Sequence, residues 1–296
     1  SSQEDGGRTE VRGPEFGHGE VVYNVIDSRQ SYPQEVVKKG VAAIHPEIGE
    51  RGSVHLSYEM VALSPAAAEE LGFEVTEEDR KKPFIEMSGR KGLGVKADDL
   101  ITRLEEKALA EVESRHPDSP IEEKKDIAHQ IAVGALRYFL LKFTRNTVIV
   151  FDFNEALSFE GETGAYCQNA VVRFNSIFKK LEPGALESAR RTVEVSGPDV
   201  RNLFGSEIGD SLWSLVTLTA RLEDAAENAA NSNEPATLAR YVFTLSKAMH
   251  LFHHTHRIII EADPVKRATL VCIADTARRA LTAALDTMGI SVPDKM

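Results

Sequence analysis

GALRYFLLKFTRNTVIVFDFNEALSFEGETGAYCQNAVVR, residues 134–173 of this 296-residue chain, runs from one apolar helical pattern into another. The first pattern starts at Ile131 and reads IAVGALRYFLLKF. Arg137 and Lys142 interrupt it, and it is shorter than the roughly 20 apolar residues that a membrane-spanning helix needs. We therefore expect a helix on each side of this segment and no membrane segment.

The second pattern, from Ala165, predicts a helix with two different faces. At helical spacing, Asn169, Arg173 and Lys180 share one face. Such a helix packs its apolar side into a core and leaves the other side to solvent. The apolar side consists of Tyr166, Ala170, Phe174, Ile177, Phe178 and Leu181.

Residues from Ala97 onward predict helix almost without interruption. Ser119 to Glu122 predicts a capping box that opens a helix through Phe143. Asp263 followed by proline predicts the start of the last helix, and Gly289 predicts its C-terminal cap. Apolar stripes at helical spacing are Leu100, Leu104, Ala108 and Val112; Leu238, Val242, Leu245, Met249 and Phe252; and Leu270, Ile273, Ala277, Leu281 and Leu285.

The part before residue 97 has a different character. Residues 1–19 are polar and glycine-rich without the apolar core of a secretory signal, so we expect them to be disordered. EVVYNVID from Glu20 and SVHLSYEMVAL from Ser53 predict strands, separated by a helix near residues 34–43. Ser64 followed by proline predicts another helix start. Alternating strands and helices indicate a parallel α/β unit, so the expected fold is mainly α with a partial α/β part.

Charge and cysteine content restrict the possible functions. A formal charge of -11, from 46 acidic and 35 basic side chains, excludes indiscriminate binding to nucleic acid or anionic membranes. Any nucleic-acid contact must therefore use a local basic face. Cys167 and Cys272 form no disulfide framework or zinc pattern, which fits a reducing cytosol. One basic cluster, which suits phosphate contacts or simply a solvated surface, consists of Arg80, Lys81, Lys82, Arg90, Lys91 and Lys96.

Histidines concentrate near residue 250 and raise the question of a metal. His250 and His254 stand one helical turn apart, but the glutamate of an HExxH motif is absent and no third ligand is identifiable. Lys247 and Arg257 continue the same stripe, which favours a helical face toward RNA or solvent. We expect no bound structural metal.

Several segments together point to a known family. They are VVYNVIDSRQSYPQEVV, HLSYEMVAL, EMSGRKG, residues 134–173 with the core FDFNEALSFEGETGAY, and EPATLARYVFTLSKAMHLFHHTHRII through MGISVPDKM. In this order they resemble the C-terminal part of bacterial arginyl-tRNA synthetases, which are class I enzymes, over roughly residues 16–296. The resemblance implies the second half of a Rossmann-like nucleotide-binding fold at 20–96. A stem-contact helical region at 97–155 and an all-helical, DALR-type anticodon-binding bundle at 156–296 follow.

The resemblance implies a cytoplasmic arginine-tRNA ligase with ATP and Mg²⁺, L-arginine and the tRNA for arginine as its substrates, and no DNA partner. The alternative is a catalytically inactive, truncated relative that acts as a tRNA-binding module. No HIGH signature, the first class I motif, occurs in the sequence, and Gly17-His18-Gly19 is not an acceptable substitute. Oligomeric state stays open.

The implied substrate-binding residues lie in the N-terminal part. Glu86 to Lys91 falls where the family has its KMSKS-type loop, with Glu86 and Gly89 in place of its lysines. The resemblance assigns Gln30 to arginine and His55 to ATP, although a turn glutamine and a satisfied strand histidine are the simpler interpretations. The resemblance also assigns ATP binding to Met87, Ser88, Arg90 and Lys91. Arg90 and Lys91 are in addition assigned to catalysis. The alternative is that this segment is only a polar turn.

The implied tRNA contacts lie in the helical part. Family members meet the anticodon region at the positions of Tyr166, Asn169, Arg173 and the terminal Met296. Asn169 replaces the usual tyrosine and Ala165 the usual proline, which weakens or alters readout by base stacking. Tyr166 has a core role as its alternative. The histidine stripe adds Lys247 and Arg257 as candidate tRNA contacts.

Overall fold

The computed structural model describes residues 19–85 and 95–296. The chain divides into two compact units, Ser1–Tyr58 and Glu59–Met296. Helices dominate the described residues, as the sequence predicted. None of the described helices is both long enough and apolar enough to span a bilayer.

The first unit is a strand, a helix and a parallel strand. β1 pairs with β2 in parallel from Val22 opposite Ser53 to Asp27 opposite Tyr58. A parallel pair requires a crossover connection, and the predicted helix supplies it. The prediction of a local parallel α/β unit is therefore confirmed. The elements are β1 (Val22–Asp27), η1 (Ser28–Gln30), α1 (Ser31–Ile44), η2 (Gly49–Gly52) and β2 (Ser53–Tyr58).

The sequence predicted a single strand from Ser53 to Leu63, but the structure has two separate strands there. The predicted strand breaks at Glu59 and Met60, so that β2 belongs to the first unit and β3 (Val61–Leu63) to the second. β3 pairs in parallel with β4 (Ile149–Phe151), and the Met60 carbonyl accepts a hydrogen bond from the Ile149 amide at 3.0 Å. Apolar and polar residues alternate from Val54 to Met60, so this pattern carries no signal for a change of partner strand at Glu59.

The second unit begins with helices that frame this short pairing. Ser64 caps α2 as predicted, because its hydroxyl accepts from the Ala67 amide at 3.0 Å. The predicted capping box at Ser119 is wrong: α4 has Pro120 at its N-cap without a side-chain bond, and the Ser119 hydroxyl accepts from Lys295 Nζ at 2.7 Å. The elements are α2 (Pro65–Glu70), η3 (Asp79–Lys81), α3 (Ala97–Arg115), α4 (Ile121–Leu141) and α5 (Phe153–Leu157).

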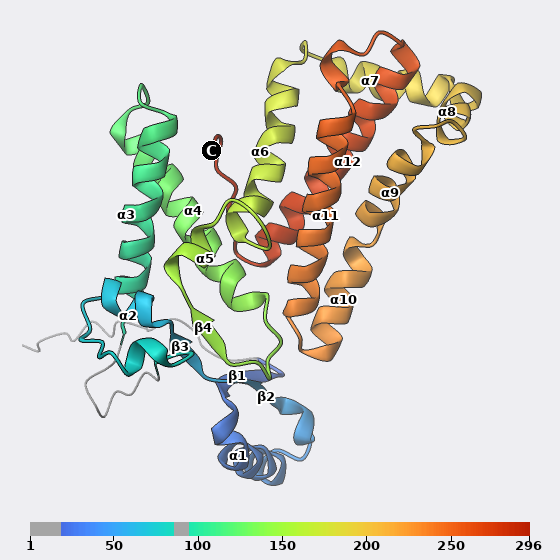
Figure 1. The fold of residues 1–296 in the computed structure, drawn as a ribbon. Coiled ribbons are helices and arrows are strands. Elements are labelled where there is room, and N and C mark those ends of the chain that lie inside the picture. Colours follow the sequence, from blue (N-terminus) through green and yellow to red (C-terminus); the bar gives the residue numbers. More distant parts are fainter. Residues whose placement is uncertain (1–18, 86–94) are drawn as a thin grey trace, which may run out of the picture. The chain divides into compact units, whose positions relative to one another are not determined.

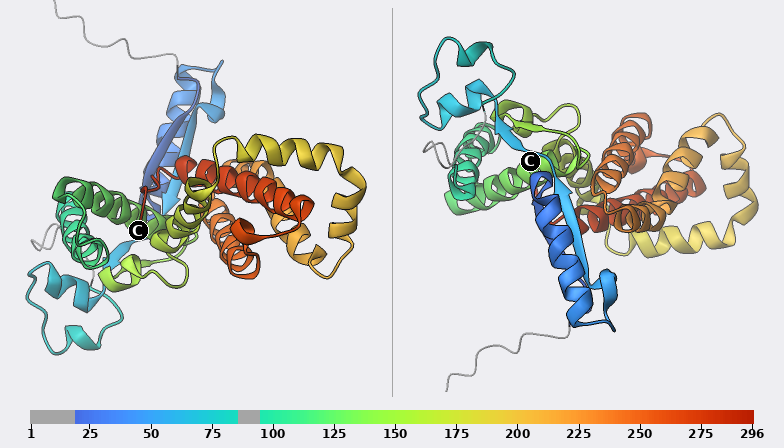
Figure 2. Two further views of the ribbon diagram at one scale, coloured as in Figure 1. Left: turned by 90° about the horizontal axis from the view of Figure 1, so that it is seen from above. Right: turned by 90° about the horizontal axis from the view of Figure 1, so that it is seen from below.

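A bundle of helices completes the second unit (Figures 1 and 2). Its core lies between α6, α11 and α12, where the predicted stripes from Leu238 and from Leu270 are buried. Asp263 caps α12 through the Lys266 amide, and Gly289 follows it with φ of 69°, both as predicted. The elements are α6 (Gly164–Lys180), α7 (Ala185–Val195), α8 (Gly197–Phe204), α9 (Gly209–Ala220), α10 (Leu222–Ser232), α11 (Ala236–Thr255), η5 (Ile258–Ile260) and α12 (Pro264–Thr287).

α4 and α6 touch at their backbones. A Cβ atom added to Gly164 would lie 2.3 Å from the Gly134 carbonyl oxygen, and one added to Gly134 would lie 2.6 Å from Gln168 Nε2. The buried Gln168 side chain donates to the carbonyls of Gln130 at 2.9 Å and Ser291 at 2.7 Å. Tyr138 of α4 continues the contact by donating to the Ala239 carbonyl of α11 at 3.1 Å. The α3 and α4 hairpin is therefore fixed to the bundle by a close backbone contact at Gly134 and Gly164 and by the hydrogen bonds of Gln168 and Tyr138.

We predict that Gly164→Ala destabilises the protein by about 1–3 kcal/mol, because the new methyl group meets backbone that cannot move aside cheaply. Urea unfolding followed by circular dichroism measures this change. Gly197→Ala is the matched control, since Gly197 also begins a helix but a Cβ atom added to it would have no neighbour within 4 Å. Equal stability of the two variants would contradict the close α4 and α6 contact.

Candidate nucleic-acid interface

The predicted tRNA-contacting residues of α6 lie on one side of that helix. Thr163 starts the helix by accepting a hydrogen bond from the Tyr166 amide at 3.2 Å. Arg173 is exposed, while Tyr166 and Asn169 are partly buried. The polar face predicted from the spacing is thus present and accessible at Arg173.

α11 lies beside this face of α6 and contributes aromatic and basic side chains. The Tyr166 ring lies 4.4 Å from the His250 ring and 5.7 Å from the Phe243 ring, measured between centroids. His250 Nε2 donates to the Tyr166 carbonyl at 3.2 Å, and Lys247 Nζ lies 5.5 Å from the centre of the Phe243 ring. We call the surface formed by Tyr166, Asn169, Arg173, Lys247 and His250, with its continuation to Arg257, the α6–α11 seam.

Burial and nearby positive charge lower the pKa of two histidines along the seam. Burial lowers the pKa of His250, and the Arg173 guanidinium acts in the same direction. Burial also lowers the pKa of His253, and Arg173, His254 and Lys180 act in the same direction. Near neutral pH these two histidines are therefore neutral, and Arg173, Lys247 and Arg257 carry the positive charge of the seam.

A cleft of about 330 Å³ lies at the C-terminal end of α11. Ile177 of α6 lines it together with His253, His254, His256 and residues 257–260. His256 is buried and its Nε2 lies 2.9 Å from the Ser211 hydroxyl, so this histidine has a structural partner. Within residues 19–85 and 95–296, no group of three His, Cys, Asp or Glu side chains is arranged to hold a metal ion.

Met296 lies on the other side of α6. It packs against a cluster from α3, α4 and the start of α6 that includes Val112, Ile131 and Ala165. Lys295 fixes the chain end through Glu123 Oε1 at 3.0 Å, in addition to Ser119. The chain end reaches this place between α3 and α6, as Figure 1 shows.

The N-terminal candidates belong to the first unit. Gln30 is exposed in η1, directly after β1, and the carboxyl end of a parallel strand is the usual place for ligands in α/β folds. His55 Nε2 donates to the Ile26 carbonyl of the neighbouring strand at 2.9 Å, so it has a structural partner. The side chain and backbone amide of Arg29 lower the pKa of Asp27 to about 2 by hydrogen bonding.

The predicted loop residues Met87, Ser88, Arg90 and Lys91 lie outside the described residues. Two other members of the basic cluster are engaged in ion pairs. Arg80 pairs with Glu69 at 2.7 Å, and Lys82 pairs with Asp79 at 2.7 Å. These carboxylates reduce the charge that Arg80 and Lys82 offer to a phosphate.

Sequence reasoning missed Phe243 and His250 as the partners of Tyr166. Helical spacing could have shown that Phe243, Lys247 and His250 share a face, because they are three and four residues apart. It could not have shown that this face meets Tyr166. Gln168 was missed for a similar reason, since its backbone partners come from distant segments.

We predict that His250 makes the stability of the protein sensitive to acid. Its pKa in the folded state lies below the unfolded value of about 6.5, so its stabilising contribution is present above pH 6.5 and is lost as the pH falls. The variant His250→Gln should lose less unfolding free energy between pH 7.5 and 5 than the unmodified chain, as measured by urea unfolding. Asn169→Gln, which changes no titrating group, should keep the original pH dependence. An unchanged slope in His250→Gln would refute the prediction.

Comparisons with known proteins place these features in a family. Residues 167–296 match the model described as DALR anticodon binding domain. The chain is 30% identical to an arginine–tRNA ligase of Pyrococcus furiosus over 95% of this chain and 41% of the relative. It is 32% identical to that of Thermus thermophilus over 94% and 42%. A solved arginyl-tRNA synthetase of Thermus thermophilus superposes with a TM-score of 0.69 at 26% identity, covering 94% of this chain and 41% of that one.

The chain thus spans about two fifths of the length of the relatives it matches. A solved synthetase of Plasmodium falciparum shares the fold, with a TM-score of 0.66 at 17% identity. These matches identify the chain as a homologue of the arginine–tRNA ligases over their C-terminal part, with a DALR anticodon binding domain at residues 167–296.

Proposed function

We propose that this chain is the tRNA-recognising part of an arginine–tRNA ligase and that the α6–α11 seam contacts the anticodon region of the tRNA for arginine. The observation that carries this proposal is the exposed Arg173 of α6, close enough to Tyr166 and His250 for its charge to act on their pKa values, with the exposed Lys247 on the neighbouring α11, within the DALR anticodon binding domain. A local basic seam is the kind of surface by which a chain of charge -11 binds a polyanion.

The side chains of the seam suit an unpaired RNA loop. The Arg173 guanidinium can bind phosphate or a base edge with paired donors. The amide of Asn169 can both donate and accept, which suits a base edge rather than stacking. Tyr166 is held between α6 and α11, so we assign to it support of the surface together with a stacking contact through its accessible part.

The activity proposed for the whole ligase is ATP-dependent activation of arginine and its transfer to tRNA, in the cytoplasm. Gln30 would orient arginine, and His55, Met87, Ser88, Arg90 and Lys91 would serve ATP with its Mg²⁺. In such a reaction the protein contributes positioning and stabilisation of negative charge as pyrophosphate leaves. Support comes from the names of the relatives and from the parallel strand pair of the first unit.

The proposed domain organisation follows the family. Residues 20–96 would be the second half of the Rossmann-like catalytic domain with the KMSKS-like loop. Residues 97–155 would contact the tRNA stem, and residues 156–296 would bind the anticodon, which agrees with the DALR match that begins at residue 167. Met296, at the side of α6, would approach the tRNA from the α3 and α4 side.

The decisive experiment measures binding of this chain to the tRNA for arginine and to a non-cognate tRNA across a salt series, with arginylation assayed in parallel. Preference for the cognate tRNA without arginylation would identify a tRNA-binding module. Arginylation would establish a working ligase. Equal binding of both tRNAs at every salt concentration would refute anticodon recognition.

We predict that Arg173→Ala weakens binding to the tRNA for arginine by about tenfold to a hundredfold, because a charge-assisted hydrogen bond contributes roughly 1.5–3 kcal/mol. The slope of log affinity against log salt should fall by about 1 if the lost contact is to a phosphate. Fluorescence anisotropy with labelled tRNA measures both values. Arg191→Ala removes an exposed arginine from α7 and is the matched control, for which affinity should change less than about twofold.

We predict that Asn169→Tyr strengthens binding to the same tRNA by about fivefold or more, since an aromatic side chain that stacks on a base contributes roughly 1–3 kcal/mol. The same anisotropy assay measures this change. Asn169→Leu adds comparable apolar bulk without an aromatic face and should not reproduce the gain. Equal or weaker binding by Asn169→Tyr would show that position 169 does not face a base.

A further inference from the structure

The side of α6 opposite the seam is held by polar contacts. Each helical residue is rotated by about 100° from the previous one, so Asn175 points about 200° away from Arg173. Gln168 and Phe178 also lie on this rear side. What fixes the rear side of α6 therefore fixes the direction in which Arg173 points.

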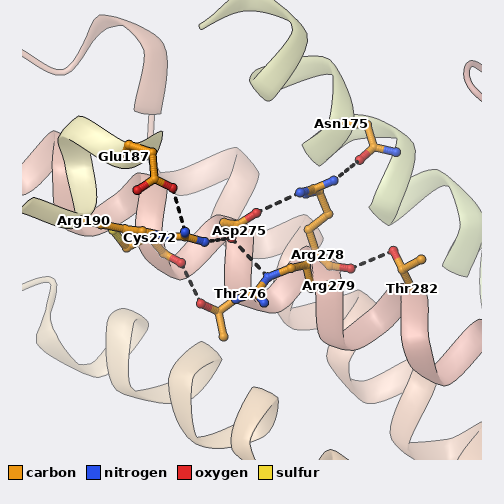
Figure 3. Close-up of polar contacts among 9 residues, drawn as sticks. All are labelled: Asn175, Glu187, Arg190, Cys272, Asp275, Thr276, Arg278, Arg279 and Thr282. Carbon is orange, nitrogen blue, oxygen red and sulfur yellow. Dashed lines mark hydrogen bonds and ion pairs between the residues drawn. The ribbon is translucent and has the colours of Figure 1, made fainter. Parts of the chain in front are cut away.

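An acidic residue of α12 forms the centre of these contacts (Figure 3). Asp275 is only 2% exposed, yet it carries a carboxylate, which is costly to bury without partners. It pairs with Arg278 at 2.8 Å and Arg279 at 3.1 Å from its own helix, and with Arg190 of α7 at 3.3 Å. Glu187 binds the other end of the Arg190 guanidinium at 2.8 Å. The carboxylate is therefore compensated, and its partners are held in fixed positions.

Arg278 connects this centre to α6. One terminal nitrogen, Nη2, donates to Asp275 Oδ1 at 2.8 Å, and the other, Nη1, donates to Asn175 Oδ1 at 3.2 Å. The same guanidinium lies over the Phe178 ring, 4.8 Å from its centre. Because a guanidinium is planar, contacts at both terminal nitrogens and at its face set its orientation. Figure 3 shows Arg278 reaching from α12 to Asn175 in this way.

We propose that Asn175 and Arg278, oriented by Asp275, are positioning residues for the tRNA-binding seam, an inference that rests on the proposed function. They act by fixing the rotation of α6 about its axis. With an outer helix radius of about 5–6 Å, a rotation of about 10° moves a side-chain tip by about 1 Å. That displacement takes a hydrogen bond near 2.8 Å beyond useful length, so Arg173 would lose its contact with RNA.

A double-mutant cycle on the whole chain tests the proposal. Asn175→Ala should weaken binding to the tRNA for arginine by about threefold to tenfold in the unmodified background. In the Arg173→Ala background the same change should weaken binding by less than about 1.5-fold, because the residue through which Asn175 acts is already gone. Asn175→Asp keeps the acceptor oxygen for Arg278 and should retain the original affinity.

Two further measurements separate positioning from damage to the fold. Thermal unfolding of each variant reports stability, and Arg278→Lys gives a second test, since lysine keeps the charge but cannot hold Asp275 and Asn175 together in one plane. It should weaken tRNA binding as Asn175→Ala does. Arg191→Ala, which removes an arginine of α7 outside the Asp275 cluster, should leave the affinity unchanged.

The outcomes distinguish the two proposals. An equal effect of Asn175→Ala in both backgrounds, or no effect in either, overturns the positioning role while binding through Arg173 stands. If Arg173→Ala itself leaves tRNA binding unchanged, the proposed tRNA surface is wrong and the positioning role falls with it. Loss of binding by Asn175→Asp equal to that of Asn175→Ala also contradicts the inference.

Discussion

The second unit depends on the backbone contact between α4 and α6. Gly134 and Gly164 allow the helices to approach so closely that a methyl group on either residue would clash. Gln168 stabilises the contact by donating hydrogen bonds to two backbone carbonyls. One of these carbonyls belongs to Ser291, beyond α12, so the same side chain also holds the C-terminal segment. Close packing of this kind transmits displacement instead of absorbing it, and the α3 and α4 hairpin, α6 and the chain end therefore form one structure.

Buried polar groups favour one arrangement of the helices over others, because their hydrogen bonds and ion pairs form only in that arrangement. Tyr138 is fully buried and donates to the Ala239 carbonyl, and burial raises the pKa of its hydroxyl. Burial also raises the pKa of the Cys167 thiol to about 12, so this cysteine is a packing residue rather than a nucleophile. Asp275 is buried and forms ion pairs with three arginines whose own side chains are partly or largely exposed. An apolar core tolerates small shifts between helices, whereas these directional contacts do not.

The net charge of the chain does not show where its basic side chains lie. The chain is acidic overall, but the proposed tRNA surface concentrates exposed cations at Arg173, Lys247 and Arg257. In the basic cluster before residue 97, by contrast, Arg80 is paired with Glu69 and Lys82 with Asp79. A cation with a carboxylate partner contributes little to the attraction of a polyanion, so the pairing pattern favours the α6–α11 seam over Arg80 and Lys82 as a tRNA surface.

By itself the sequence determined the local structure. Helical spacing predicted the buried stripes of α11 and α12, the caps at Ser64, Asp263 and Gly289, and the accessible side of α6 that carries Arg173, because period and cap chemistry depend only on neighbouring residues. The tertiary structure decided which surfaces meet. It divided the predicted strand at Glu59, and it brought Lys295 to the Ser119 hydroxyl, which therefore does not cap α4. It also packed Tyr166 against His250 and placed Arg278 between Asp275 and Asn175. Such contacts join residues that are distant in the chain, and no local pattern specifies them, since their energy exists only after the helices have packed.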